Sequence, residues 1–358
     1  MVARRIVPLI LSLAFAATAC AGADPSTIRG AIEAKKQESE SRDVGAPPAP
    51  DAERTGRVGV SLATNSAGWE KTLGTPAVDG AVILFVNPAS PAERSGLKRG
   101  DVITKVGGSG IRNDERARVG LRGRPGVPLR VTLARGTETI ELTVTPGPAL
   151  DVDLVKLVDR LLEQDPEDPT HLLLRAQTTE NVQESLRYVD RALDAEPDLV
   201  DALVFRARLF WSESLQINNE VIVQEDRRRA ADDYRRALEI DPDATAALRS
   251  RATGALEVSE FDDAERDGLR AIGIDPTLPG AYYIVAAARY SGGNIRDAVA
   301  PARKAIRLDP YDATSYRLLA LAFVALGRTE DARKTVDAGL TVAVDENQRA
   351  ALRATVED

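Results

Sequence analysis

The sequence of 358 residues has one cysteine and one histidine, and these two scarcities exclude several kinds of site. One cysteine cannot form an intramolecular disulfide, and one cysteine with one histidine cannot supply a zinc-ligand cluster. A Ser-His-Asp triad would need His171 as its base, but we expect this residue on the surface of a helix. The sequence therefore predicts a protein that is not an enzyme and binds no metal or cofactor.

Apolar runs long enough to cross a membrane are also missing. The run from Ile6 to Ala17 has about twelve residues, whereas a membrane-spanning helix needs about twenty. Arg4 and Arg5 precede this run, and the pattern predicts a secretory signal over residues 1–20. The composition, with 43% hydrophobic and 28% charged residues, is otherwise that of a soluble globular protein.

The signal ends with Ala17, Thr18, Ala19 and Cys20, which resemble a bacterial lipobox. The resemblance implies a lipoprotein that is exported, anchored to a membrane through lipid on Cys20, and facing the periplasm or another extracytoplasmic space. The alternative is ordinary signal cleavage beside an incidental cysteine. Ala21 gives no retention signal, so the membrane is not specified.

Residues 21–54 have little of the patterning that forms a core. Their second half, SRDVGAPPAPDAER, is rich in proline, alanine and charge, which predicts a flexible tether. A flexible coil of this length averages roughly 30 Å from end to end, so the folded part would search a volume near its anchor.

The segment after the tether has signals for a small β-rich domain. Ala81 to Val86 predicts a buried strand, Ser90 and Glu93 predict a capping box on a short helix, and Val102 to Val106 predicts a second strand. This order resembles the PDZ domain of bacterial HtrA-type and C-terminal-processing proteases. The resemblance covers residues 55–148, beginning near RVGVSL and ending after LRGRPGVPLRVTLARG.

In the resembled fold an extended peptide adds as a strand to a sheet edge, and loop amides hold its terminal carboxylate. The facing wall is the helix expected over residues 113–122. The alternative is an occluded or purely structural groove. The resemblance implies these peptide-binding residues: Arg57, Val58, Gly59 and Val60 in the loop, Ser61 and Leu62 on the edge strand, and Ala117 and Leu121 on the helix.

The second half of the chain has a proline period. Asp-Pro or Glu-Pro pairs place prolines at 166, 197, 242, 276 and 310, with spacings of 31, 45, 34 and 34. A period of 34 is that of tetratricopeptide repeats, which this half resembles. The resemblance implies an all-α solenoid of about five repeats over residues 166–346, after a linker helix at 149–165 and before a capping helix at 347–358. The expected fold class is multidomain α and β.

The 45-residue spacing exceeds the period by eleven residues, close to three helical turns, which predicts a long helical hairpin with an insertion near 212–226. Its charged end, EDRRRAADDYRR, predicts a solvated, salt-bridged helix. The repeat phase places these residues on the inner face of the solenoid: Arg208, Trp211, Arg249, Tyr283, Tyr290 and Arg317.

Arginines interleaved with aromatics suit an extended peptide that carries acidic groups. The alternative is that these side chains only pack or solvate the inner wall. The dicarboxylate clamp of the family needs asparagines, and this chain has Thr253, Ala287 and Leu321 instead.

Charge divides unevenly: residues 53–148 carry a net +5 and residues 149–358 a net −13. The two modules should therefore prefer differently charged partners or attract each other. An exported chain of net charge −8 is not expected to bind nucleic acid.

The sequence predicts a scaffold or adaptor that binds proteins or peptides through both modules. One alternative is a regulatory or substrate-presenting partner of an envelope protease, or a divergent protease relative without its catalytic domain. Another is a structural spacer with no specific ligand.

Overall fold

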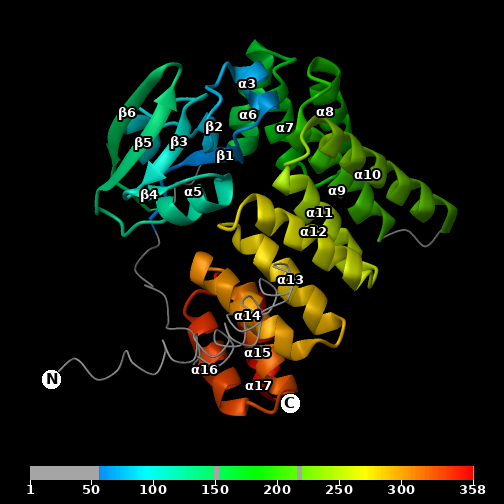
Figure 1. Cartoon of the computed structure of the whole chain (residues 1–358). Coiled ribbons are helices and arrows are strands. Elements are labelled where there is room, and N and C mark those ends of the chain that lie inside the picture. Colours follow the sequence, from blue (N-terminus) through cyan, green and yellow to red (C-terminus); the bar gives the residue numbers. More distant parts are fainter. Residues whose placement is uncertain (1–55, 149–152, 216–219, 358) are drawn as a thin grey trace, which may run out of the picture. The chain divides into compact units, whose positions relative to one another are not determined.

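The computed structural model describes residues 56–148, 153–215 and 220–357 (Figure 1). The predicted signal, the tether and Cys20 lie outside the described residues, as does part of the predicted linker. All of the described residues belong to one compact unit. None of the described helices is both long and apolar enough to cross a membrane. The predicted fold class, a small β-rich domain followed by an all-α array, is confirmed.

The PDZ-like domain (residues 56–148) is built on an antiparallel sheet with the order β1-β2-β3-β5-β6, while β4 pairs with β3. β1 lies at one edge, where it pairs with β2 alone among the described strands. The strands are β1 (Val60–Thr64), β2 (Ala81–Val86), β3 (Val102–Val106), β4 (Ser109–Gly110), β5 (Leu129–Arg135) and β6 (Glu138–Val144).

Three helices accompany this sheet: α3 (Ala67–Leu73), α4 (Pro91–Arg94) and α5 (Asp114–Leu121). Half of the predicted capping box on α4 is present: the Ser90 hydroxyl accepts a hydrogen bond from the Glu93 amide at 3.1 Å. The Glu93 carboxylate accepts in turn from the Ala89 amide at 2.7 Å, one residue earlier than in the standard box. Asn113 caps α5 in the same way, through Arg116 N–H at 2.8 Å.

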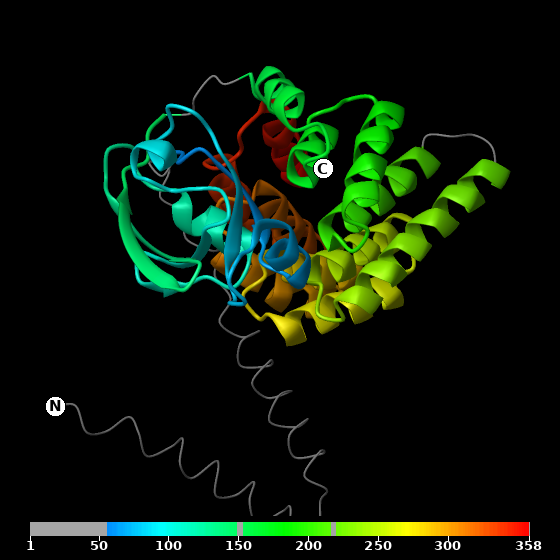
Figure 2. The same cartoon turned by 90° about the horizontal axis from the view of Figure 1, so that it is seen from above.

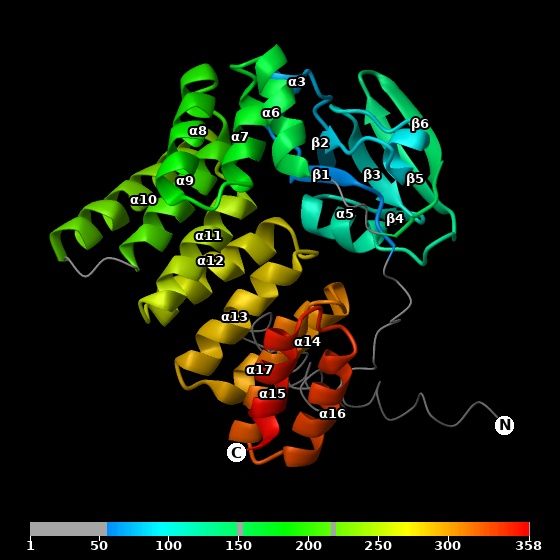
Figure 3. The same cartoon turned by 180° about the vertical axis from the view of Figure 1, so that it is seen from behind.

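The repeat array (residues 153–357) is a succession of helices in which neighbours along the chain pack together (Figure 3). α6 occupies the predicted linker segment and α17 follows the last repeat. The helices are α6 (Leu154–Gln164), α7 (Pro169–Gln177), α8 (Val182–Ala195), α9 (Val200–Ser214), α10 (Glu220–Ile240), α11 (Thr245–Glu257), α12 (Phe261–Ile274), α13 (Pro279–Ser291), α14 (Ile295–Leu308), α15 (Ala313–Ala325), α16 (Thr329–Leu340) and α17 (Glu346–Glu357).

The Asp-Pro pairs end helices for a local reason. The residue before proline is disfavoured in the helical region, and Asp275 and Asp309 accordingly adopt extended conformations after α12 and α14. The Asp275 carboxylate then accepts from the Thr277 amide at 2.8 Å, which fixes the turn into α13.

Small residues stand where paired helices approach most closely. Eight alanines on the helices from α11 to α16 are each at most 1% exposed. Two aromatic side chains of α15, Tyr316 and Phe323, are also fully buried. The eight are Ala252, Ala264, Ala271, Ala286, Ala298, Ala305, Ala320 and Ala332.

The helices α9 and α10 pack against each other, and α10 is a single long helix of 21 residues (Figure 2). On its charged stretch Arg228 pairs with Glu225 at 2.9 Å and with Asp232 at 3.0 Å. The predicted salt-bridged helix is confirmed.

The PDZ-like domain and the array share an apolar cluster. Trp69 of α3 is fully buried in it together with Leu199 and Leu203 of the array, and its indole N–H donates to the Asp201 carboxylate. The Trp69 side chain therefore lies between the two modules.

The surface position predicted for His171 is wrong, since this residue is only 8% exposed. It lies on α7, where Arg99 of the PDZ-like domain donates to Asp168 and Thr170 at 2.6 to 2.9 Å. Burial lowers the pKa of His171. The repeat pattern could not show that another domain covers this end of α7.

Candidate functional site

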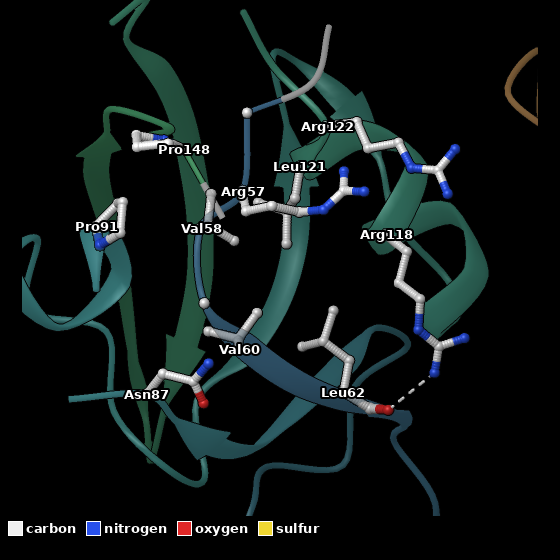
Figure 4. Close-up of a pocket in the computed structure, with 12 residues that line it drawn as sticks. Arg57, Val58, Val60, Leu62, Asn87, Pro91, Arg118, Leu121, Arg122 and Pro148 are labelled. Carbon is white, nitrogen blue, oxygen red and sulfur yellow. Dashed lines mark hydrogen bonds between the residues drawn. The ribbon is translucent and has the colours of Figure 1, made fainter. Parts of the chain in front are cut away.

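A cavity of about 400 Å³ lies between β1 and α5 (Figure 4). We call it the groove. It is formed by the loop before β1, the first part of β1 and the second half of α5. Its lining residues are Gly56, Arg57, Val58, Gly59, Val60, Leu62, Asn87, Pro91, Arg118, Leu121, Arg122 and Pro148.

The loop before β1 is held by its carbonyls. The Val58 carbonyl accepts from the Ala92 amide and the Gly59 carbonyl from the Asn87 amide, both at 2.9 Å. Within the described part of the chain, the Val58 and Gly59 amides donate to no acceptor. Two backbone donors at the groove are therefore available to an anion.

Gly59 is required for this loop. Its φ is +82°, and a Cβ at this position would lie 2.5 Å from the Ser90 Cβ. A side chain here would strain the backbone and displace α4.

The strand β1 directs alternate residues to the groove. Val60 and Leu62 line it while Ser61 does not. On α5, Leu121 is 4% exposed and lines the groove, whereas Ala117 is fully buried in the domain core and is not a lining residue. The groove wall is thus apolar around Val60, Leu62 and Leu121.

Three arginines line the groove, and no acidic side chain does. Arg57 is exposed and has no ion-pair partner among the described residues. Arg118 pairs with Asp114 at 2.5 Å and donates to the Leu62 carbonyl at 3.2 Å. The groove therefore presents an excess of positive charge beside an apolar wall.

Sequence reasoning missed Arg118 and Arg122. Arg122 lies 3.7 Å from Asp309 and places its guanidinium 5.4 Å from the centre of the Tyr311 ring. Helical spacing from Leu121 could have indicated Arg118, which lies one turn earlier on the same helix. No local signal pointed to Asp309, because it is far away in the sequence.

A second cavity of about 610 Å³ lies on the array, between α9, α10, α11 and α13. We call it the array cavity. Of the predicted inner-face residues, the array cavity brings together Arg208, Trp211, Arg249 and Tyr283. Tyr290 and Arg317 are not lining residues, although Arg317 is exposed.

Glycine and aromatic residues shape the array cavity. A Cβ on Gly254 would lie 2.9 Å from the Trp211 ring, so the ring lies against the backbone of α11. The Trp211 indole N–H donates to the Glu257 carboxylate. Burial raises the pKa of Tyr283.

Comparison with known protein families assigns both modules. A family model of the PDZ domain matches residues 56–145, and a tetratricopeptide-repeat model matches residues 221–279 and 286–347. The chain carries a PDZ domain followed by tetratricopeptide repeats. Both modules are of kinds that mediate protein interactions.

The PDZ domain has relatives among serine proteases. The chain is 38% identical over 81 residues to the putative serine protease HhoB of Synechocystis, and 37% identical over 67 residues to serine protease HTRA1 of Xenopus tropicalis. These alignments cover 22% and 19% of this chain. The chain spans less than a fifth of the length of either relative, 19% and 14%.

Among solved structures, a thermophilic TPR protein of Thermus thermophilus is similar, with 20% identity and a TM-score of 0.44. The match covers 48% of this chain and 89% of that protein. In the described part of this chain, no group of three or more histidine, cysteine, aspartate or glutamate residues is placed to hold a metal ion.

Proposed function

We propose that this protein is an exported, membrane-anchored adaptor whose PDZ groove binds the C-terminal end of a partner protein. The observation that carries the proposal is the groove itself, where two available backbone amides adjoin an apolar wall and an arginine without a partner. No acidic lining residue opposes an anion.

The chemistry of each part suits one part of a peptide terminus. The terminal carboxylate would accept from the Val58 and Gly59 amides, with Arg57 nearby as a counter-charge. An apolar last side chain would pack against Val60, Leu62 and Leu121. The peptide backbone would extend the sheet at β1, whose outer edge pairs with no described strand.

The array would hold a second protein segment in the array cavity. Arg208 and the aromatic residues there suit a segment that carries an acidic residue next to an apolar one. When a partner binds one module, the effective concentration of its second segment at the other module rises. A partner that binds both modules would therefore be held more tightly than either contact alone allows. Lipid on Cys20 would keep this activity at a membrane surface.

A second candidate function is that of a regulatory or substrate-presenting partner of an envelope protease, or a divergent protease relative that lacks a catalytic domain. This candidate is supported by the serine-protease relatives, which the chain matches only within the PDZ domain.

A library of peptides with free C-termini, measured against the purified protein, tests the main proposal. We expect selective binding that is lost when the same peptides are amidated, and that weakens about tenfold (about 1.4 kcal/mol) in Arg57→Glu. Arg130→Glu, which reverses an exposed charge on β5 outside the groove, is the matched control. Equal binding of free and amidated peptides would contradict the proposal.

Gly59 is not a useful position for this test. The clash with Ser90 and the positive φ mean that a substitution at Gly59 would also disturb the fold of the loop.

A further inference from the structure

The helix α5 lies between the groove and the repeat array. Arg118 and Leu121 of α5, and Arg122 directly after it, line the groove. Asn113, the N-cap, and Glu115 instead contact residues of the array. One short helix therefore serves as the groove wall and as a contact surface between the modules.

The start of α5 is fixed by buried polar contacts. The side-chain amide of Asn113 donates to the Asp275 carboxylate. Asn113 is 1% exposed and Asp275 is 6% exposed. Glu115 pairs with Arg249 of α11 and also accepts from the Gly280 amide at 3.3 Å. Burial raises the pKa of Glu115, and the Arg249 charge opposes that rise.

The rest of α5 is held by the turn between α14 and α15. Arg116 donates to the Leu308 carbonyl. Arg122 follows the last turn of α5 and lies beside Asp309 and over the Tyr311 ring. Thus α11, the α12–α13 turn, the start of α13 and the α14–α15 turn all contact this helix or its ends.

The same helix is tied to β1 at two places. The Thr64 hydroxyl donates to the Asp114 carboxylate at 2.8 Å, and Arg118 donates to the Leu62 carbonyl at 3.2 Å. The distance between β1 and α5 sets the width of the groove, and α5 cannot move away from the array without leaving the buried Asn113 and Asp275 side chains unpaired. Each such group costs about 1–3 kcal/mol. A wall fixed before binding reduces the ordering cost that a peptide must offset.

We propose that the repeat array is part of the PDZ peptide site. In this proposal Arg249, Asp275 and Asp309 are positioning residues, which set the place of α5 against β1 and thereby the affinity for a peptide that none of them touches. The inference rests on the proposed function of the groove.

The test compares two arginines of α11. Arg249→Ala removes the partner of Glu115, while Arg251→Ala removes an ion pair with Asp267 inside the array, where the nitrogen–oxygen distance is 2.6 Å. We expect the Kd for a C-terminal peptide selected by the full protein to rise about tenfold in Arg249→Ala and less than twofold in Arg251→Ala. Arg249→Lys, which keeps the charge, should recover part of the affinity.

A double substitution separates positioning from general damage. Because Glu115 and Arg249 act as a pair, Glu115→Gln combined with Arg249→Ala should weaken binding no more than Arg249→Ala alone. Additive losses, or equal Kd values in Arg249→Ala and Arg251→Ala, would overturn the proposal.

A measurement without ligand distinguishes failure of this inference from failure of the proposed function. Amide hydrogen exchange of α5 should be at least about tenfold faster in Arg249→Ala than in Arg251→Ala. If α5 exchanges faster in Arg249→Ala but the unaltered protein binds no peptide, the proposed function of the groove is wrong, whereas the array still supports α5. Unchanged exchange would overturn that support, whatever the groove binds.

Discussion

Single residues decide what the array cavity can bind. Arg249 is engaged by Glu115, and the Trp211 indole N–H is engaged by Glu257. Arg208 is exposed, and its contact with the Phe205 ring, 5.9 Å from guanidinium to ring centre, leaves its charge without a carboxylate partner among the described residues. The charge that remains for a ligand is therefore that of Arg208.

This charge gives a prediction for Arg208 that Trp211 can report. The chain has two tryptophans, and Trp69 is fully buried, so a change of indole emission on binding at the array cavity would come from Trp211. We expect acetylated and amidated peptides with a central glutamate–phenylalanine pair to change the emission saturably. Arg208→Glu should weaken this binding about tenfold, because it replaces attraction by repulsion.

The matched control for Arg208→Glu is Arg317→Glu, which reverses an exposed arginine on α15 outside the array cavity. Peptides with lysine in place of glutamate should not bind. An emission change that persists in Trp211→Phe would show that the signal has another origin.

The sequence indicated part of both sites at this scale. The residues from Arg57 to Val60 and the aromatic residues of the array follow from resemblance and repeat phase. Arg118 could have been predicted from its helical spacing to Leu121. The pairing of Arg122 with Asp309 could not, because only the packing of the modules brings these two residues together.

At the scale of elements, α3 is joined to α9 by a hydrogen bond from Trp69 to Asp201. Burial, reinforced by the nearby Asp114 carboxylate, raises the pKa of Asp201 to about 7 from an ordinary value of 3.8. Between these values the folded protein holds a proton that the unfolded chain has released. The interface between α3 and α9 is therefore weakened as this carboxyl ionises.

The stability of the protein should depend on pH through Asp201. The free energy of unfolding should fall as pH rises from about 4 to about 7, by at most about 1.4 kcal/mol per pH unit from this group, and the effect should level off above that range. Urea unfolding at several pH values measures it. Asp201→Asn, whose amide oxygen can still accept from Trp69, should remove this part of the dependence.

The control for Asp201→Asn is Asp194→Asn, which neutralises an exposed carboxylate on α8. It should leave the pH profile as it is in the unaltered protein. A profile that is the same in all three proteins would show that Asp201 does not titrate differently on folding.

Most elements could be predicted because their signals are local. Ser90 and Asn113 cap their helices within three residues, and the Asp-Pro pairs end helices through the conformation that proline imposes. The role of α5 could not be predicted, since Asn113 meets Asp275 across 162 positions of sequence. The burial of His171 could not be predicted either, because Arg99, which contacts the start of α7, is far from it in the sequence.

On the scale of the whole molecule, the contact between the PDZ domain and the array reflects the uneven charge of the chain. Three basic residues of the PDZ domain, Lys71, Arg99 and Arg122, each pair with an acidic residue of the array. In one further pair the acidic residue, Glu115, belongs to the PDZ domain and the basic residue, Arg249, to the array. For a domain of net +5 and an array of net −13, the sequence predicted either differently charged partners or mutual attraction, and these ion pairs favour the second alternative. Beneath them lies the shared apolar cluster around Trp69.

These two kinds of contact respond differently to salt. Raising the ionic strength from about 0.1 M to about 1 M shortens the Debye length from roughly 10 Å to roughly 3 Å, which weakens the exposed ion pairs but not apolar burial. We therefore expect the radius of gyration from small-angle scattering to be the same at both salt concentrations.

The apolar cluster should become decisive when Trp69 is removed. Trp69→Ala deletes a fully buried side chain at the contact, a change that typically costs about 3–5 kcal/mol, and leaves the ion pairs as the main attraction. This variant should be as compact as the unaltered protein at low salt and should expand at high salt. Trp211→Ala removes the other tryptophan, away from the contact, and should stay compact at both. Expansion of the unaltered protein at high salt would mean that charge, and not the Trp69 cluster, holds the modules together, and the support of α5 by the array would then be salt-dependent as well.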